Sequence, residues 1–114
     1  MRTWPNLPDH IARAWADPLL ADRERADQYL RMFASIRASD LLAAEPAIAR
    51  LKVPTLIVWG TGDTFFDRKW AYWLRDTIPG ATEVIELDNA RLFFPDERAS
   101  ELTTALRDIW EAHP

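Results

Sequence analysis

The sequence predicts an α/β protein: a helical N-terminal half followed by a βαβα unit with two parallel strands. Two observations predict this class. Apolar residues recur every three or four positions up to Leu51, and two short β-rich runs, 55–59 and 82–87, then flank a helical segment. The change of character at Lys52 divides the chain into a helical segment, 1–51, and an α/β portion, 52–114.

Three helical stretches are expected in the first half. Asp9 is expected to cap a first helix that Pro18 ends. From Asp22 onward an amphipathic helix is predicted, and Asp40 opens a third stretch that Pro46 divides into two short pieces. The apolar face of the second helix comprises Ala26, Tyr29, Leu30, Phe33 and Ile36.

The second half alternates strands and helices. Residues 55–59 form an unbroken apolar run, which is typical of a strand buried on both faces of a parallel sheet. Asp67 precedes a helix closed by Pro79 and Gly80, residues 82–87 form the second strand, and Asp96 is expected to cap the last helix. Two strands alone leave an edge on each side, so the sequence predicts an unfinished sheet.

Composition excludes several classes of function. The net charge is −4, and Lys and Arg are scattered among acids without a basic block, so no nucleic-acid partner is expected. With no cysteine, disulfides, thiolate nucleophiles and Cys-ligated zinc are ruled out, and no carboxylate–histidine cluster predicts a metal or cofactor. Apolar stretches fall below the ~20 residues of a membrane span and no signal sequence is evident, so a cytoplasmic location and no membrane partner are expected.

Three segments carry a family resemblance. Residues 51–63 read LKVPTLIVWGTGD, residues 78–81 read IPGA, and residues 92–98 read LFFPDER. Together they resemble the C-terminal end of α/β-hydrolases, in the branch of epoxide hydrolases, haloalkane dehalogenases and related esterases. The resemblance implies a partial α/β-hydrolase fold, truncated relative to the family, in which 52–114 is the C-terminal portion of the core. The segment 1–51 resembles the end of the family's cap domain.

The same resemblance implies a role for Asp63. It matches the acid that orients the catalytic histidine, at the carboxyl end of a parallel strand. The alternative interpretation is that Asp63 only shapes the turn after the strand. The family's histidine aligns with Leu92, which cannot transfer a proton. His10 and His113 are interpreted as solvated surface residues and not as substitute bases.

The nucleophile is also missing from the sequence. There is no Gly-x-Ser-x-Gly elbow and no oxyanion-hole segment, and Ser35, Ser39 and Ser100 do not follow predicted strands. A lone triad acid supports no turnover, so this chain by itself is not expected to be catalytic.

Four aromatic residues are candidates for a substrate pocket. Phe65 and Phe66 follow Asp63 directly and are predicted at the mouth of a site, although a turn packed on the core fits them equally. Trp15 and Phe33 are candidates for a hydrophobic slot in the cap-like segment, with ordinary packing as the alternative.

Three hypotheses of function follow. In the first, the chain is a member or fragment of the α/β-hydrolase family, whose complete protein hydrolyses a small apolar ester, epoxide or halide. In the second, it is a non-catalytic interaction module that pairs through its open sheet edge, as a homodimer or with the missing N-terminal half. In the third, it is a degenerate ligand-binding protein that keeps the pocket without the chemistry.

Overall fold

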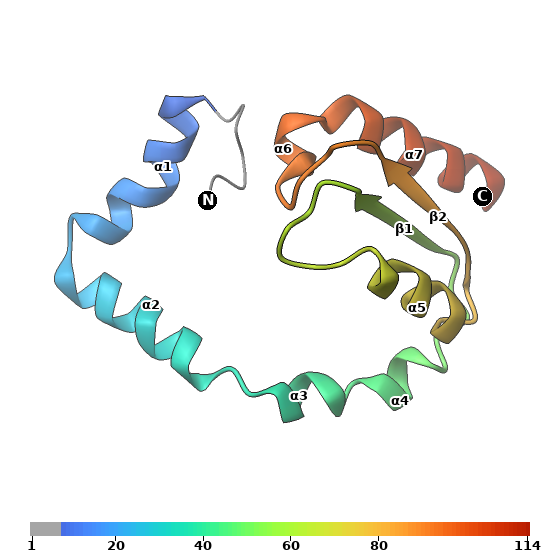
Figure 1. The fold of residues 1–114 in the computed structure, drawn as a ribbon, viewed down its shortest axis with the longest axis horizontal. Helices are drawn as coiled ribbons and strands as arrows, with labels where there is room; N and C mark the ends of the chain where they lie inside the picture. Colours follow the sequence, from blue (N-terminus) through green and yellow to red (C-terminus); the bar gives the residue numbers. More distant parts are fainter. Residues whose placement is uncertain (1–7) are drawn as a thin grey trace. The chain divides into compact units, whose positions relative to one another are not determined.

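The computed structural model describes residues 8–114 and confirms an α/β chain with helices and a two-stranded parallel sheet (Figure 1). Contacts divide these residues into two compact units, 8–45 and 46–114. The elements in chain order are α1 Asp9–Leu20, α2 Arg23–Ser35, α3 Ala38–Leu42, α4 Glu45–Ile48, β1 Thr55–Gly60, α5 Lys69–Thr77, β2 Ala81–Leu87, α6 Phe94–Glu97 and α7 Ala99–Ala112.

The unit 8–45 is helical, as the apolar periodicity predicted. Asp22 begins α2 as expected, because its carboxylate accepts a hydrogen bond from the Glu24 amide at 2.9 Å. Two predictions about α1 are wrong. Asp9 is the first residue of the helix and no side chain caps it, and Pro18 lies inside the helix, which continues to Leu20. Pro18 has no amide hydrogen to donate to the Ala14 carbonyl. Because Ala14 is exposed, water can replace the missing hydrogen bond.

The third helical stretch forms two short pieces, α3 and α4, as predicted. Pro46, however, does not separate them: it lies in the first turn of α4, where a backbone donor has no partner within the helix. Asp40 likewise lies in the first turn of α3, which begins at Ala38.

In the unit 46–114, β1 and β2 are parallel neighbours joined through α5, so the predicted βαβ connection is confirmed. Thr55 lies opposite Ala81 and Ile57 opposite Val84, an irregularity that places one extra residue in β2. The Asp67 carboxylate accepts a hydrogen bond from the Lys69 amide at 2.8 Å at the start of α5.

Helices pack on both faces of this sheet (Figure 1). On the α5 face, Ile57 of β1, Ala71 and Ile78 of the α5 region and Ala81 of β2 form the buried core. Because side chains alternate along a strand, Leu56 points to the other face, where α7 contacts β1. A helix, a sheet and a second helix thus form three layers.

The chain leading into α7 differs from the prediction. Asp96 does not cap the last helix, because residues Phe94–Glu97 form a short helix of their own, α6. Arg98 precedes α7 and provides no side-chain cap, but its guanidinium donates to the Asp88 carbonyl and to both carboxylate oxygens of Glu101. Arg98 therefore ties the start of α7 to the loop after β2.

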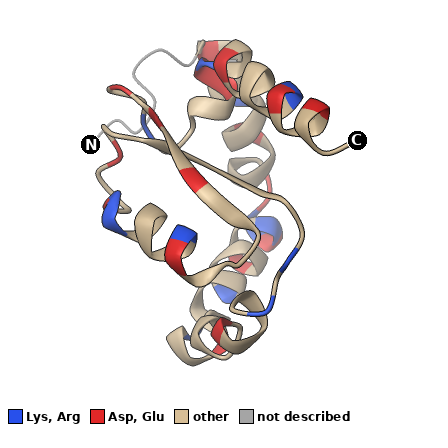
Figure 2. Ribbon diagram, turned by 90° about the vertical axis from the view of Figure 1, so that its right-hand side faces the viewer, with Lys and Arg blue, Asp and Glu red and all other residues tan. Residues whose placement is uncertain are grey.

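The core of the described residues is small. Its buried hydrophobic residues are mostly alanines, and no large side chain is fully buried. Large apolar side chains instead face solvent, among them Trp110 at 68% exposure and Leu30 at 64%. Basic and acidic residues are interspersed over the described elements (Figure 2). The two-stranded sheet does not cover the apolar surface of its own helices.

Candidate functional site

The turn after β1 is held against the loop after β2. The Thr61 amide donates to the Leu87 carbonyl at 3.0 Å, and the Gly62 amide donates to the Ala90 carbonyl at 2.9 Å. The Thr61 hydroxyl accepts a bond from the Asn89 amide at 2.8 Å. These bonds bring the two loops that follow the parallel strands to the same end of the sheet.

Glycine is required where the two loops meet. A Cβ atom at Gly60 would lie 2.2 Å from the Ala90 carbonyl oxygen, and one at Gly62 would lie 2.8 Å from the Asn89 carbonyl oxygen. Both distances are shorter than any ordinary contact, so a side chain at either position would push the loops apart. The glycines therefore permit the close approach that builds the site.

Asp63 ends this turn, and its carboxylate is anchored by the backbone. One oxygen, Oδ1, accepts hydrogen bonds from the amides of Phe65 at 2.8 Å and Phe66 at 3.0 Å. The alternative interpretation of Asp63 as a residue that shapes the turn thus describes a contact that is present. That contact uses one carboxylate oxygen only, so it is compatible with a second role.

A pocket of about 160 Å³ opens beside this carboxylate. It is lined by Asp63, Phe66, Leu92 and Phe94 together with residues 58–60 of β1, and we call it the Asp63 pocket. The structure therefore brings Asp63, which was predicted as the triad acid, and Leu92, at the predicted histidine position, to one pocket. Leu92 supplies only hydrocarbon there, so among the described residues no imidazole lines the pocket.

The aromatic candidates are distributed unevenly. Phe65 and Phe66 are about equally exposed, at 55% and 52%. Phe66 lines the Asp63 pocket, whereas Phe65 contacts Asp63 through its amide. Sequence reasoning missed Phe94 and Trp59, which also line the pocket. The sequence feature that could have predicted Trp59 is its position near the end of the strand that leads to Asp63. For Phe94, that feature is its position in the segment that contains Leu92.

Trp15 and Phe33 belong to the other unit, 8–45. Trp15 in α1 is 41% exposed and Phe33 in α2 is 52% exposed. The ring of Phe33 packs on Tyr29 with 4.7 Å between ring centroids. A role for Trp15 and Phe33 in a substrate slot stays a prediction.

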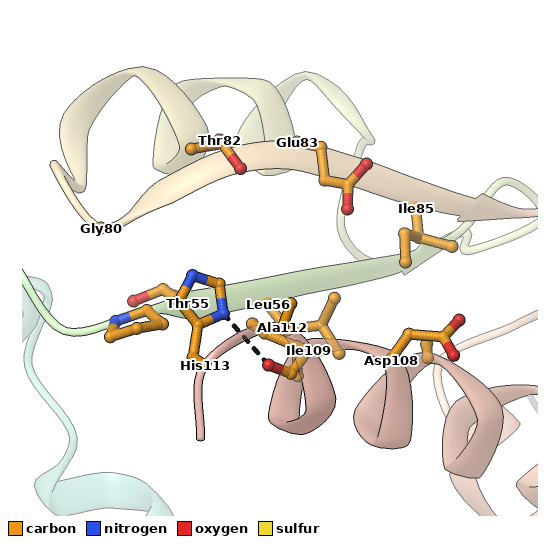
Figure 3. Close-up of a pocket in the computed structure, with 12 residues that line it drawn as sticks. Thr55, Leu56, Gly80, Thr82, Glu83, Ile85, Asp108, Ile109, Ala112 and His113 are labelled. Atoms are coloured by element: carbon orange, nitrogen blue, oxygen red, sulfur yellow. Dashed lines mark hydrogen bonds between the residues drawn. The ribbon is translucent and has the colours of Figure 1, made fainter.

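His113 lies at the opposite end of the sheet from Asp63. It lines a separate hollow of about 190 Å³ between the two-stranded sheet and α7, near Thr55 and Gly80 at the amino ends of the strands (Figure 3). Its Nδ1 lies 3.1 Å from the Ile109 carbonyl oxygen. The six residues of β1 separate the two sites by about 20 Å at ~3.3 Å per residue, so His113 cannot bond to Asp63.

None of the serines considered above, Ser35, Ser39 and Ser100, is hydrogen-bonded to a described group that would activate it as a nucleophile. The Ser35 hydroxyl donates to the Met32 carbonyl at 2.6 Å at the end of α2, and Ser39 and Ser100 lie in exposed helical turns. His10 is an exposed residue of α1. Within residues 8–114 no hydrogen bond joins a serine to an imidazole, so no nucleophile–base pair is assembled there.

The clearest pKa shifts fall outside the Asp63 pocket. The Tyr72 hydroxyl donates to Glu86 at 2.7 Å, and this bond to a carboxylate raises the pKa of the phenol. The bond between Arg98 and Glu101 lowers the pKa of the Glu101 carboxyl and raises the pKa of the guanidinium. Both pairs tie helices to the sheet or to a loop, which is a structural role.

Over the described residues, no group of three or more His, Cys, Asp or Glu side chains is arranged to hold a metal ion. None of the helices in 8–114 combines the length and the apolar run needed to cross a bilayer. Comparison of the chain with protein-family models, with curated proteins and with solved structures finds no match.

Proposed function

We propose that this chain is the acid-bearing C-terminal part of an α/β-hydrolase core, which acts on a small apolar ester, epoxide or halide only when other segments complete it. One observation carries the proposal: Asp63, at the carboxyl end of a parallel strand, lines the same pocket as Leu92. Open α/β sheets place their sites at this end. The nucleophile, the oxyanion hole and a base in place of Leu92 would come from those other segments.

The free edge of β1 supports this completion. The amides of Thr55 and Thr61 donate toward β2, so by the alternation of a parallel ladder the backbone groups of Leu56 and Val58 point away from it. Residues 8–114 supply no strand on that side of β1, because the sheet they form contains β1 and β2 alone. Unpaired backbone groups in an apolar strand favour the addition of a further strand.

The residues around the two edges of the sheet also favour addition of a strand at β1 and not at β2. β1 contains no charged residue, and a hollow lined by Leu56, Leu106, Ile109 and Trp110 lies between it and α7. β2 contains two acidic residues, Glu83 and Glu86, and its pairing with β1 is irregular near its start. Both features discourage the addition of a strand to the β2 edge. We therefore assign the completing strand to the β1 edge.

Two measurements test the proposal. The purified chain should not hydrolyse p-nitrophenyl acetate or styrene oxide faster than buffer does, and Asp63→Asn should not change that rate, because an acid without nucleophile and base contributes no turnover. Turnover that Asp63→Asn abolishes would contradict this. The reading frame that surrounds the coding segment should encode a nucleophile elbow; a frame that lacks one would remove the hydrolase assignment.

The same open edge favours a second candidate, a non-catalytic module that pairs with another copy of itself. If the β1 strands of two copies pair antiparallel, only uncharged residues lie opposite one another. If the β2 strands pair instead, Glu83 of one copy approaches Glu86 of the other, and the two like charges repel. Light scattering after size-exclusion chromatography tests this candidate. A dimer that forms with rising concentration and is lost in Val58→Pro supports it, and a monomer at all concentrations removes it.

A further inference from the structure

The Asp63 pocket has walls that suit a positive charge. Three aromatic residues line it, Trp59, Phe66 and Phe94. The faces of aromatic rings attract cations through their quadrupoles. The indole of Trp59 donates a hydrogen bond to the Phe66 carbonyl at 3.2 Å, which fixes two of these residues relative to each other. Aromatic walls of this kind are the usual setting for recognition of alkylated ammonium groups.

Among the described residues, no ion pair joins a cation to the one carboxylate in the pocket. The ion pairs of the described residues join Asp22, Glu86, Asp76 and Glu101 to arginines, and none of them includes Asp63. The two amides that bond to Oδ1 orient the carboxylate of Asp63 without neutralising its charge. A negative charge beside apolar walls is stabilised by an opposite charge more strongly than it would be in bulk water.

Leu92 decides what kind of cation the pocket can hold. An imidazole at this position would occupy the space beside Asp63 and bond to its carboxylate. Leucine cannot form that bond, and it adds an apolar side chain to the lining of the pocket. The volume of about 160 Å³ is that of roughly five water-sized groups at ~30 Å³ each. An ammonium nitrogen with four methyl groups has this size.

We propose that the Asp63 pocket binds a small alkylated ammonium cation, with the charge against the Asp63 carboxylate and the methyl groups against Trp59, Phe66 and Phe94. Such a ligand satisfies the charge of Asp63 and needs no hydrogen-bond acceptor, which matches a lining whose side chains are one carboxylate and otherwise aromatic or aliphatic. This inference does not require the chain to belong to a hydrolase. It assigns to the triad-acid position a role in binding in place of catalysis.

The test is a titration of the ¹⁵N-labelled chain with tetramethylammonium chloride, followed by two-dimensional NMR. Saturable shifts in the millimolar range are expected at the Trp59 indole N–H and at the amides of Phe65 and Phe66, which contact the carboxylate. Sodium chloride at equal ionic strength and tert-butanol, a neutral molecule of similar shape, are the ligand controls. Shifts of equal size with tert-butanol, or no saturable shift at all, would overturn the proposal.

Two variants locate the binding energy. Asp63→Asn keeps the Oδ1 acceptor for both amides but removes the charge, and it should weaken binding about tenfold or more. Asp96→Asn, in the exposed turn of α6, makes the same change of net charge and should leave affinity unchanged. Leu92→His should compete with the ligand by placing an imidazole beside Asp63. Unchanged affinity in Asp63→Asn would exclude this site even if the cation binds elsewhere.

Discussion

Replacement of Gly60 by alanine tests the loop contact that forms the Asp63 pocket. Gly60 has a negative φ, as do all three glycines, so the backbone itself accepts a side chain. In the absence of a clash, Gly60→Ala would therefore stabilise the fold by about 0.4–1 kcal/mol through the unfolded state. The structure predicts the opposite sign, because the new Cβ would lie 2.2 Å from the Ala90 carbonyl oxygen.

The size of the effect follows from what must move. The Ala90 carbonyl has to retreat until the contact exceeds 3.0 Å, and it is the acceptor of the 2.9 Å bond from Gly62. Overpacking costs about 1–3 kcal/mol and the weakened bond about 1 kcal/mol, so the net loss after the entropic gain is about 1–3 kcal/mol.

Urea unfolding followed by tryptophan fluorescence measures this difference. Gly62→Ala is the matched control: its Cβ would lie 2.8 Å from the Asn89 carbonyl oxygen, so its loss should be smaller. If Gly60→Ala is as stable as the parent chain, or more stable, the loops do not approach as described and the Asp63 pocket has another shape.

Three further predictions concern pairs and helices outside the pocket. Glu86→Gln should lower the pKa of Tyr72, seen in an ultraviolet titration, because the carboxylate is what raises it; an unchanged phenol titration would refute the contact. Glu101→Gln should unfold more easily than the parent at neutral pH but equally in acid. The hydrogen bond from Arg98 lowers the pKa of Glu101 in the folded state. The stability that this bond contributes is therefore present above the unfolded pKa and is lost as pH falls through the folded pKa. Pro18→Ala should raise the helicity measured by far-ultraviolet circular dichroism, since it restores a donor inside α1, and a decrease would mean that α1 ends before it.

Strand and helix positions were predictable where the pattern is local. The apolar run at 55–59 and the β-rich run at 82–87 match β1 and β2 closely, because an unbroken apolar segment between turn residues has few other stable forms. Helix caps were not: Asp9 and Asp96 have the right chemistry, but Asp9 is the first helical residue of α1, after Pro8, and Asp96 lies inside α6. Whether a carboxylate caps depends on the backbone before the helix, which the pattern of side chains does not encode.

The candidate site divides in the same way. Asp63 was predictable as the residue after a strand end, and its proximity to Leu92 was expected only through the family resemblance. Phe94 is brought to the pocket by the loop after β2, whose path depends on the close approach at Gly60. A contact between segments this far apart in sequence leaves no trace in composition or periodicity.

Amide hydrogen exchange along β1 tests the central claim most directly, because the claim is that this sheet is completed by another segment. In the purified chain the amides of Leu56 and Val58 should exchange much faster than those of Ile57 and Trp59, which face β2. Protection of all four amides to the same degree in a monomer would contradict the account, since it would mean that the outer edge of β1 is already paired within this chain.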